Sequence, residues 1–170
     1  MPALIALALS VGVLAVAATW LFLVPAAIVA AHLQVWQAFI AWGCHFHCGG
    51  KFTGYRNATV CMIFGALVGM VAAMLAGQLG ALGQFALPVA VGIGASVICL
   101  ASALPLLSAV PASVYGFAAI AGLMIAGHAA PAQAILPTAI SIVIGAIFGI
   151  VSEHLAGALA KKEAPAAAAA

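Results

Sequence analysis

Residues 57–78 read NATVCMIFGALVGMVAAMLAGQ, an unbroken run without a charged side chain. A bilayer's hydrocarbon core, about 30 Å thick, needs about 20 apolar helical residues to cross it. Five further stretches of this kind lie at roughly 3–23, 26–47, 87–108, 111–127 and 135–156. The sequence therefore predicts an all-α, polytopic transmembrane helix bundle of about six spans. Barrel strands are not expected, because the runs are continuously apolar and do not alternate.

Prolines and glycines separate the runs. Pro25 and Pro111 each follow an apolar run, and proline disfavours helix in the residue before it. Gly49-Gly50 and the polar stretch 51–57 predict one polar loop. Further breaks are expected near residues 79–86 and 128–134. The stretch 111–127 is the shortest, so a half-span or re-entrant element remains an alternative there.

The composition excludes several classes of protein. Charged residues make up 4% of the 170 residues, and the formal net charge is +2. The mean hydropathy is +1.37. Six charges cannot keep a soluble domain of this size dispersed, and they cannot bind nucleic acid. We therefore expect the lipid bilayer as a partner and no nucleic acid.

No catalytic constellation is visible in the sequence. There is no Ser/His/Asp set, no pair of carboxylates and no phosphate-binding glycine motif. No Asp, Glu, Lys or Arg lies in the middle of a predicted span, where ion-driven transporters carry such groups. We expect neither an enzyme nor a cofactor.

The basic residues orient the bundle. Lys51 and Arg56 lie between the second and third spans, and Lys161 and Lys162 follow the last. Under six spans all four lie on one side, which the positive-inside rule makes cytoplasmic. Both termini of this multi-pass protein are then cytoplasmic. No basic region precedes the first apolar run, so a cleaved signal peptide is not expected. We expect one transmembrane domain, 1–160, and a disordered Ala-rich tail, 161–170.

The chain shows signs of an internal repeat. Val24-Pro25-Ala26-Ala27 recurs as Val110-Pro111-Ala112-Ser113, at an offset of 86. The segment GALVGMV at 65–71 recurs as GAIFGIV at 145–151, at an offset of 80. The halves, roughly 1–80 and 81–160, then hold three spans each. An odd number of spans gives the halves opposite orientations, the inverted repeat of many transporters and channels. Chance similarity between Gly- and Ala-rich segments is the alternative.

Paired glycines mark two helix faces. Gly65 and Gly69, like Gly145 and Gly149, are spaced four apart and share a face that lets another backbone approach. We expect the third and sixth spans to pack against each other, or against neighbouring subunits, through these faces. Six short helices make a slim bundle, so a homo-oligomer is expected.

Polar side chains concentrate in the second span. At about 100° per residue, Gln34, Gln37, Cys44 and His45 fall on one stripe. Positions 39 and 40 fall on another face, and His47 points away from the stripe. Ser113 and Tyr115 follow the second repeat proline, where a helix start exposes free N–H groups. We predict that these six polar residues line a solute path: Gln34, Gln37, Cys44, His45, Ser113 and Tyr115. Interhelical hydrogen bonding is the alternative.

Cysteines and histidines cluster at the end of this span. Cys44, His45 and Cys48 are weak candidate metal ligands, since thiolates and imidazoles suit zinc or copper. A complete tetrahedral site would need ligands from elsewhere in the chain. Cysteines that act as small apolar residues are the simpler interpretation, so no metal is expected.

Several short motifs carry a family resemblance. They are Val35-Trp36-Gln37-Ala38-Phe39, Phe46 to Gly50, Val110-Pro111-Ala112-Ser113 with Gly116, and Leu136-Pro137 followed by Gly145 to Gly149. In this order they resemble the YcdZ-like family of small bacterial inner-membrane proteins, a domain of unknown function. The resemblance covers most of residues 3–156 and implies a polytopic plasma-membrane protein with no established activity. His45 and His47 depart from the family pattern, so it lends a metal role no support.

Three functions remain to be compared. The leading hypothesis is a passive channel or uniporter for a small uncharged or weakly charged solute. The first alternative is a membrane scaffold or accessory subunit that transports nothing. The second is a metal-linked sensor or transporter built on Cys44, His45 and Cys48.

Overall fold

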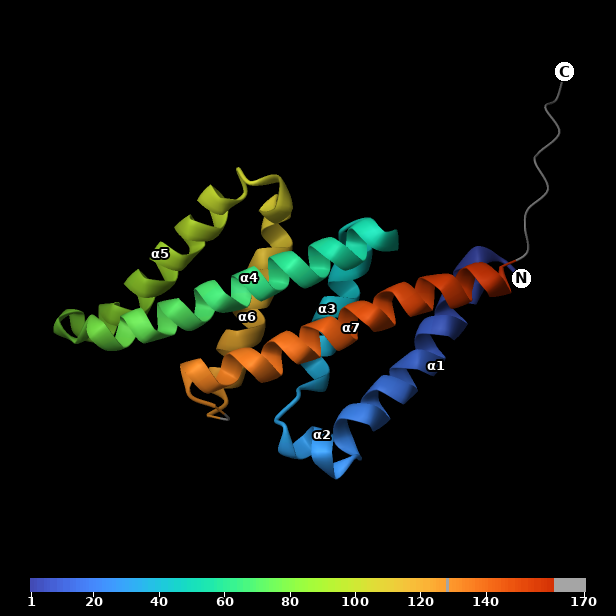
Figure 1. The fold of residues 1–170 in the computed structure, drawn as a ribbon, viewed down its shortest axis with the longest axis horizontal. Helices are drawn as coiled ribbons and strands as arrows, with labels where there is room; N and C mark the ends of the chain where they lie inside the picture. The colour runs from blue at the N-terminus through green and yellow to red at the C-terminus, as the bar shows by residue number, and fades with distance from the viewer. Residues whose placement is uncertain (128, 161–170) are drawn as a thin grey trace, which may run out of the picture.

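The computed structural model describes residues 1–127 and 129–160, and every regular element in them is helical. The central helices form two layers. In one layer α4 and α7 lie side by side, and α3 and α6 lie behind them (Figure 1). The elements in chain order are α1 (Ala3–Leu23), α2 (Ala26–Ala30), α3 (Val35–His47), α4 (Lys51–Gln78), η1 (Gly80–Phe85), α5 (Ala86–Ala101), η2 (Pro105–Leu107), α6 (Val110–Ile125) and α7 (Pro131–Leu159). The predicted all-α bundle is confirmed.

Four helical segments in the described part of the chain are long and apolar enough to cross a membrane. They are Ala3–Leu23, Lys51–Gln78, Gly80–Ala101 and Pro131–Leu159. α6, with 16 residues, and α3, with 13, are shorter than the roughly 20 residues of a full crossing. The count of six spans therefore stays a prediction.

The predicted second span, 26–47, is wrong as one helix. It divides into α2 and α3, separated by residues 31–34. His32 has a φ of 55°, a left-handed conformation that no continuous helix tolerates. The backbone N–H of Gln34 instead donates to Ser141 Oγ on α7, at 3.0 Å. A tertiary contact thus replaces an intrahelical hydrogen bond at the start of α3.

Other predicted boundaries also change. The expected polar loop 51–57 is the first part of α4, because the chain turns earlier, at Gly49 (φ 92°) and Gly50 (φ 67°). The predicted span 87–108 ends as a helix at Ala101, followed by η2. Pro25 precedes the five-residue α2, whereas Pro111 lies in the first turn of the 16-residue α6. The predicted equivalence of these two prolines is therefore not seen.

α4 and α7 bury the same pattern of positions. Adding 80 to the number of each buried residue of α4 gives a buried residue of α7. The buried residues are Gly54, Ala58, Cys61, Met62, Gly65, Ala66, Gly69 and Ala72 in α4, and Ala134, Thr138, Ser141, Ile142, Gly145, Ala146, Gly149, Ser152 and Ala156 in α7. The two helices thus use equivalent faces, each against a different neighbour.

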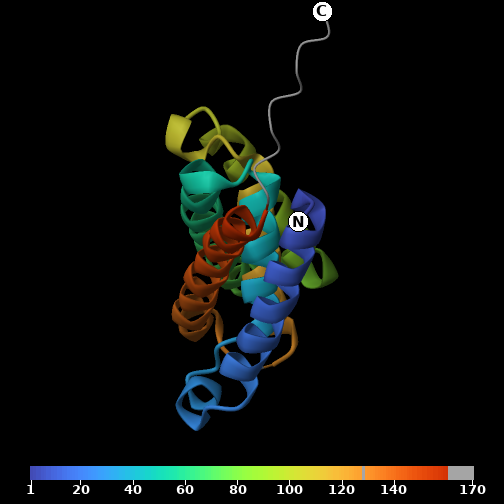
Figure 2. The same cartoon turned by 90° about the vertical axis from the view of Figure 1, so that its right-hand side faces the viewer.

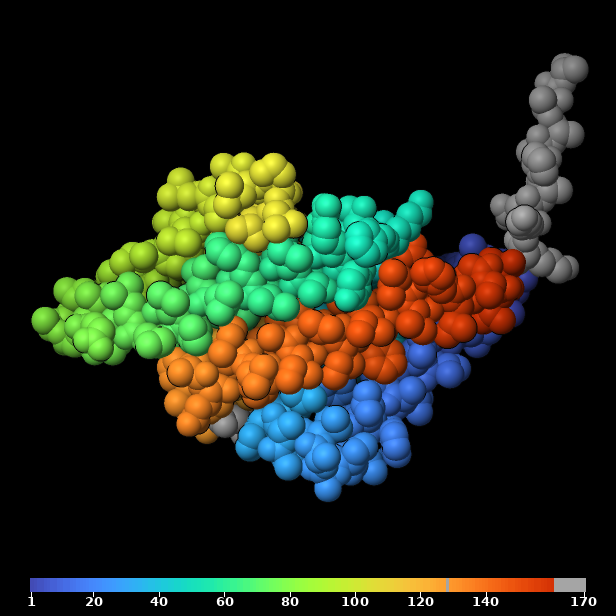
Figure 3. Space-filling model, viewed as in Figure 1, coloured from blue at the N-terminus to red at the C-terminus, as the bar shows by residue number. Residues whose placement is uncertain are grey.

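The other helices pack on α4 and α7 in two corresponding groups. α6 packs mainly on α4 and α3 mainly on α7, while α5 covers α4 and α1 covers α7. The space-filling view shows α4 and α7 lying side by side across one broad face (Figure 3). Small buried residues fill the centre, among them Ala41, Ala66, Ala112 and Ala146. Small residues at helix interfaces let backbones approach closely, as in membrane bundles.

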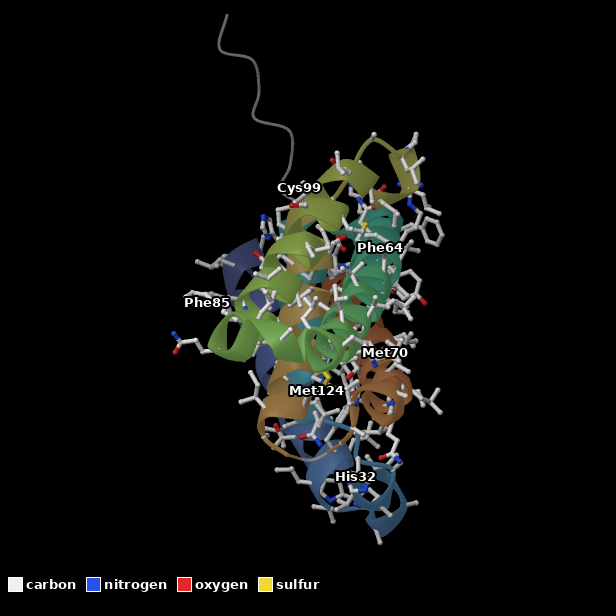
Figure 4. The ribbon with its side chains drawn as sticks, turned by 90° about the vertical axis from the view of Figure 1, so that its left-hand side faces the viewer. His32, Phe64, Met70, Phe85, Cys99 and Met124 are labelled. Atoms are coloured by element: carbon white, nitrogen blue, oxygen red, sulfur yellow. The ribbon has the colours of Figure 1, made fainter. Side chains whose placement is uncertain are left out.

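The surface is apolar. Leu4, Leu100 and Ile125 are each more than three-quarters exposed, and many other large aliphatic side chains point outward. Phe64 lies in a groove between α4 and α5, where its neighbours are also apolar (Figure 4). Such a surface is unfavourable in water and matches the hydrocarbon of a bilayer. The fold is that of a membrane protein.

The start of α1 and the end of α7 lie at one end of the bundle (Figure 2). The Met1 ammonium donates to the carbonyl of Leu159, at 3.4 Å. Lys51, at the start of α4, lies at the same end, since its backbone N–H contacts Glu153 near the end of α7. We call this end the Lys51 end. The expected tail, with Lys161 and Lys162, lies outside the described residues.

Candidate functional site

Glycines set how closely the central helices cross. A Cβ at Gly65 of α4 would overlap the main-chain carbonyl of Ser113 in α6. A Cβ at Gly145 of α7 would likewise overlap the carbonyl of Ala38 in α3. α4 and α7 do pack against each other, but their paired glycines face α6 and α3 instead. The faces that were predicted to join the third and sixth spans are therefore used within the chain, each on a shorter helix.

The second glycine of each pair packs against a side chain. A Cβ at Gly69 would lie 2.7 Å from Cγ2 of Ile120 on α6. A Cβ at Gly149 would lie 2.7 Å from Cβ of His45 on α3. The equivalent place in the two crossings is thus filled by an isoleucine in one and by a histidine in the other.

The crossing of α3 and α7 contains polar contacts on both sides of its paired glycines. The four contacts are Gln34 N to Ser141 Oγ at 3.0 Å, Gln37 Nε2 to Thr138 Oγ1 at 3.0 Å, Trp42 Nε1 to Ser152 Oγ at 3.0 Å, and His45 Nε2 to Glu153 Oε2 at 3.1 Å. No side-chain hydrogen bond joins α4 to α6 among residues 1–127, the part that contains both helices. Side-chain hydrogen bonds thus join α3 to α7 but not α4 to α6, where the Ser113 hydroxyl is buried without a partner.

Gln37 lies at the centre of the polar crossing. Its side chain is fully buried, and its amide nitrogen donates to the carbonyl of Ala119 on α6 at 2.9 Å as well as to Thr138. The amide oxygen has no hydrogen-bond partner. Gln37 thus joins α3 to both α6 and α7 and still presents one free acceptor inside the bundle.

Three further buried polar atoms in the described residues also lack a partner. They are His45 Nδ1, Thr59 Oγ1 and Ser113 Oγ. A buried polar atom without a partner costs free energy, about 1–3 kcal/mol, unless water or a ligand reaches it. Gln37, His45 and Ser113, which carry three of these four atoms, belong to the predicted solute path.

A surface cavity of about 340 Å³ lies between α3 and α6, open to the outside of the bundle, where Gly43 and Ala118 are exposed. Its polar lining comes from the Cys44 thiol, the His47 imidazole and the Tyr115 hydroxyl, which lies 2.8 Å from His47 Nδ1. The remaining lining residues are Phe39, Ile40, Gly43 and Ala118. Pockets for small molecules have this character, with apolar walls and a few placed polar groups.

The sequence comparison assigns the chain to a family. A family model described as "Protein of unknown function (DUF1097)" matches residues 8–157. The chain belongs to the DUF1097 family. A search of the curated proteins found no match, and neither did a search of the solved structures. The expected membership in a family of unknown function is confirmed, and the YcdZ-like name remains a resemblance.

In this DUF1097 protein the predicted path residues occupy three places. Cys44 and Tyr115 line the cavity. Gln37, His45 and Ser113 do not line it and are buried within the helix crossings. Gln34 lies outside the helix, at the start of α3, where its side chain contacts the carbonyl of His32 and the indole of Trp36.

Sequence reasoning missed three lining residues. His47 was expected to point away from the path, and positions 39 and 40 to lie on another face, but Phe39, Ile40 and His47 all line the cavity. The stripe of Gln37, Cys44 and His45 does face the interior. The cavity lies on the neighbouring face, which α3 shares with α6. The four-residue spacing of Gly43 and His47 is the signal that would have indicated that face.

The candidate metal ligands are held apart. Cys44 Sγ lies 3.9 Å from Cys48 Sγ, but the His45 ring is directed towards Glu153 on α7. Within residues 1–127 and 129–160, no group of three His, Cys, Asp or Glu residues is placed to hold a metal ion. Cys99 is an exposed residue of α5 (Figure 4).

Proposed function

We propose that the protein is a passive channel or uniporter for a small uncharged or weakly charged solute. The observation that carries the proposal is that α3 and α6, the two helices that line the cavity, each bury an acceptor without a partner, Gln37 Oε1 and Ser113 Oγ. Such atoms can replace part of a solute's hydration shell inside a membrane. The charged residues of the described chain, Lys51, Arg56 and Glu153, all belong to the Lys51 end.

The cavity limits the solute that this proposal can accommodate. Its volume of about 340 Å³ is near the lower end for small-molecule sites. Cys44, His47 and Tyr115 offer one thiol, one imidazole and one hydroxyl. A neutral solute with one or two hydrogen-bonding groups fits this lining, whereas a strongly charged solute would lack a counter-charge.

An inverted repeat supports transport, and we include it in the proposal. α4 and α7 have 28 and 29 residues and bury equivalent positions at an offset of 80. Each packs on the second helix of the other half, α6 or α3. Inverted repeats place substrate sites at the interface between the halves. The cavity lies between α3 and α6. α3 belongs to the first half and packs on α7 of the second, and α6 belongs to the second half and packs on α4 of the first.

A membrane scaffold or accessory subunit is the alternative, and one observation favours it. The amide nitrogen of Gln37 already makes two interhelical hydrogen bonds, to Ala119 and Thr138. Buried amides commonly join helices in this way. Under this alternative the cavity holds lipid, and the four polar contacts between α3 and α7 serve assembly alone.

The setting of the protein is part of the proposal. We place it in the bacterial inner membrane, with the Lys51 end and both termini cytoplasmic, because the basic residues lie there. The apolar surface requires lipid as a partner. A homo-oligomer would widen this slim bundle, but the paired glycines are already covered within the chain, so subunits would meet through other faces.

A flux assay on proteoliposomes tests the proposal. The probes are urea, glycerol and short-chain amides, whose entry is followed by light scattering after rapid mixing. Gly43 lines the cavity, and a Cβ there meets no atom within 4 Å, so Gly43→Leu fills the cavity without a backbone clash. Gly92→Leu on α5, also in open space, is the matched control. We expect Gly43→Leu to lower flux and Gly92→Leu to leave it unchanged. No flux of any probe above empty vesicles would favour the scaffold.

A further inference from the structure

Glu153 joins three helices at the Lys51 end. Its Oε2 atom accepts a hydrogen bond from the backbone N–H of Lys51, at 2.6 Å, and lies 3.1 Å from His45 Nε2. The carboxylate belongs to α7, Lys51 begins α4 and His45 lies near the end of α3. The partners of this carboxylate are thus a backbone N–H and an imidazole.

The backbone is shaped to bring Glu153 to this position. Gly50 has a φ of 67°, Lys51 a φ of 54°, and a Cβ at Gly50 would lie 3.0 Å from Glu153 Oε2. The first N–H groups of a helix lack intrahelical partners and attract negative charge. Glu153 therefore caps the 28-residue α4 from another helix, and the ionised form makes the stronger contact.

The imidazole of His45 cannot move on its own. Its side chain is fully buried, with Gly149 of α7 against Cβ and Gly54 of α4 against the carbonyl and Nδ1. Nδ1 has no hydrogen-bond partner. The neutral tautomer that donates from Nε2 to Glu153 fits this place, because a second N–H at Nδ1 would be buried unpaired. The His45 side of the contact is therefore fixed, whereas the Glu153 side chain is 32% exposed and can exchange a proton with water.

We propose that the Glu153 carboxylate is a proton-binding site that controls opening of the bundle at the Lys51 end. A proton from water forms an O–H bond on the carboxylate and removes its charge. The neutral acid accepts weaker hydrogen bonds from Lys51 N–H and His45, so the turn between α3 and α4 detaches from α7. The site does not depend on solute transport, although it would gate the proposed path at that end.

The other titratable groups near Glu153 do not replace it. Lys51 and His154 share an open pocket with it, and the Met1 ammonium lies farther along α7, at Leu159. His154 Nδ1 contacts the carbonyl of its own helix at Ile150, 2.7 Å away, and within the described residues its ring forms no hydrogen bond to α3 or α4. The direction follows from the geometry. The closed state needs ionised Glu153, so it is stable at higher pH and lost as the pH falls.

Hydrogen exchange on the full chain in nanodiscs tests the proposal. The measured quantity is amide exchange in residues 48–56, corrected for its intrinsic pH dependence, between about pH 3 and about pH 7, a range that spans the ordinary pKa of a glutamate, about 4.3. For the wild type we expect exchange to rise roughly tenfold or more as the pH falls, because charge-assisted hydrogen bonds are lost. Glu153→Gln, which fixes the neutral form, should exchange fast at every pH. His154→Gln should behave as the wild type.

Infrared spectroscopy keeps the test decisive if Glu153→Gln does not fold. The chain has two carboxyl side chains, Glu153 and Glu163. In Glu163→Gln, the band of a protonated carboxylic acid should rise over the same pH range as the exchange. Exchange in 48–56 that does not change with pH would overturn the proposal. So would slow exchange in a folded Glu153→Gln protein, or a carboxyl that titrates outside the range of opening.

Discussion

Gly145 of α7 lies directly against the main-chain carbonyl of Ala38 in α3, with no room for a side chain between them. Gly65 of α4 has the same relationship to the carbonyl of Ser113 in α6. Each long helix therefore holds the shorter helix of the other half by backbone contact. This arrangement fixes the distance between α3 and α6, and the cavity lies between those two helices.

A methyl group at either glycine should destabilise the bundle. We expect Gly65→Ala and Gly145→Ala to lower the free energy of unfolding by about 1–3 kcal/mol, because overpacking forces the backbones apart. The changes are measured by unfolding in mixed micelles. Gly77→Ala on α4 and Gly157→Ala on α7 are matched controls, since a Cβ there meets no atom within 4 Å. Equal stability of all four variants would contradict the close contacts.

Gln37 and Thr138 should be energetically coupled through their hydrogen bond. A double-mutant cycle with Gln37→Leu and Thr138→Val is expected to give a coupling of about 0.6 kcal/mol, typical of buried polar pairs in membrane bundles. Gln37→Leu should also reduce flux, because it removes the unpaired acceptor Oε1. Gln78→Leu, at the exposed end of α4, is the control. Coupling without any effect on flux would assign Gln37 to helix packing alone.

The sequence predicted most of the helices because apolar runs of membrane length have few alternatives. It failed at residues 31–34, where no proline or glycine marks a break. The chain leaves the helix there because Gln34 N–H finds Ser141 Oγ, which lies 107 positions away. A local pattern contains no information about such a partner. The early start of α4 has the same cause, since Lys51 N–H is satisfied by Glu153.

The site was only partly predictable for a related reason. The periodicity of α3 correctly turned Gln37, Cys44 and His45 towards the interior. It could not show that the cavity lies on the neighbouring, more exposed face of α3, because that depends on where α6 crosses. The place where α6 crosses is set by the glycines of α4 and α7, which contact α6 and α3. The sequence had predicted that these glycine faces contact each other. For this reason the prediction did not include His47 among the lining residues.

The topology should place both termini on one side. The Met1 ammonium reaches Leu159, so an even number of crossings separates the two ends of the described bundle. Reporter fusions at residues 82 and 130 are expected to read periplasmic, and one after 162 cytoplasmic, because the basic residues lie at the Lys51 end. A periplasmic reporter after 162 would contradict both the orientation and the count.

Accessibility of the cavity separates a solute path from a lipid-filled groove. In a background without native cysteines, Gly43→Cys and Ala118→Cys place thiols on its opposite walls, on α3 and α6. Ala41→Cys is the control, because Ala41 lies on the same helix and is fully buried. We expect the two lining thiols to react with small water-soluble methanethiosulfonates, and position 41 to stay inert. A thiol reacts as its hydrated thiolate, so reaction requires water in the cavity.

The same experiment distinguishes the proposed functions. If both lining thiols react, and a panel solute slows their modification, the cavity binds that solute from water. If they react only with membrane-soluble maleimides, lipid fills the cavity. The polar crossing of α3 and α7 would then hold a scaffold together. Because Ala41→Cys reports on exposure of the core, its reaction with either reagent would indicate unfolding rather than access.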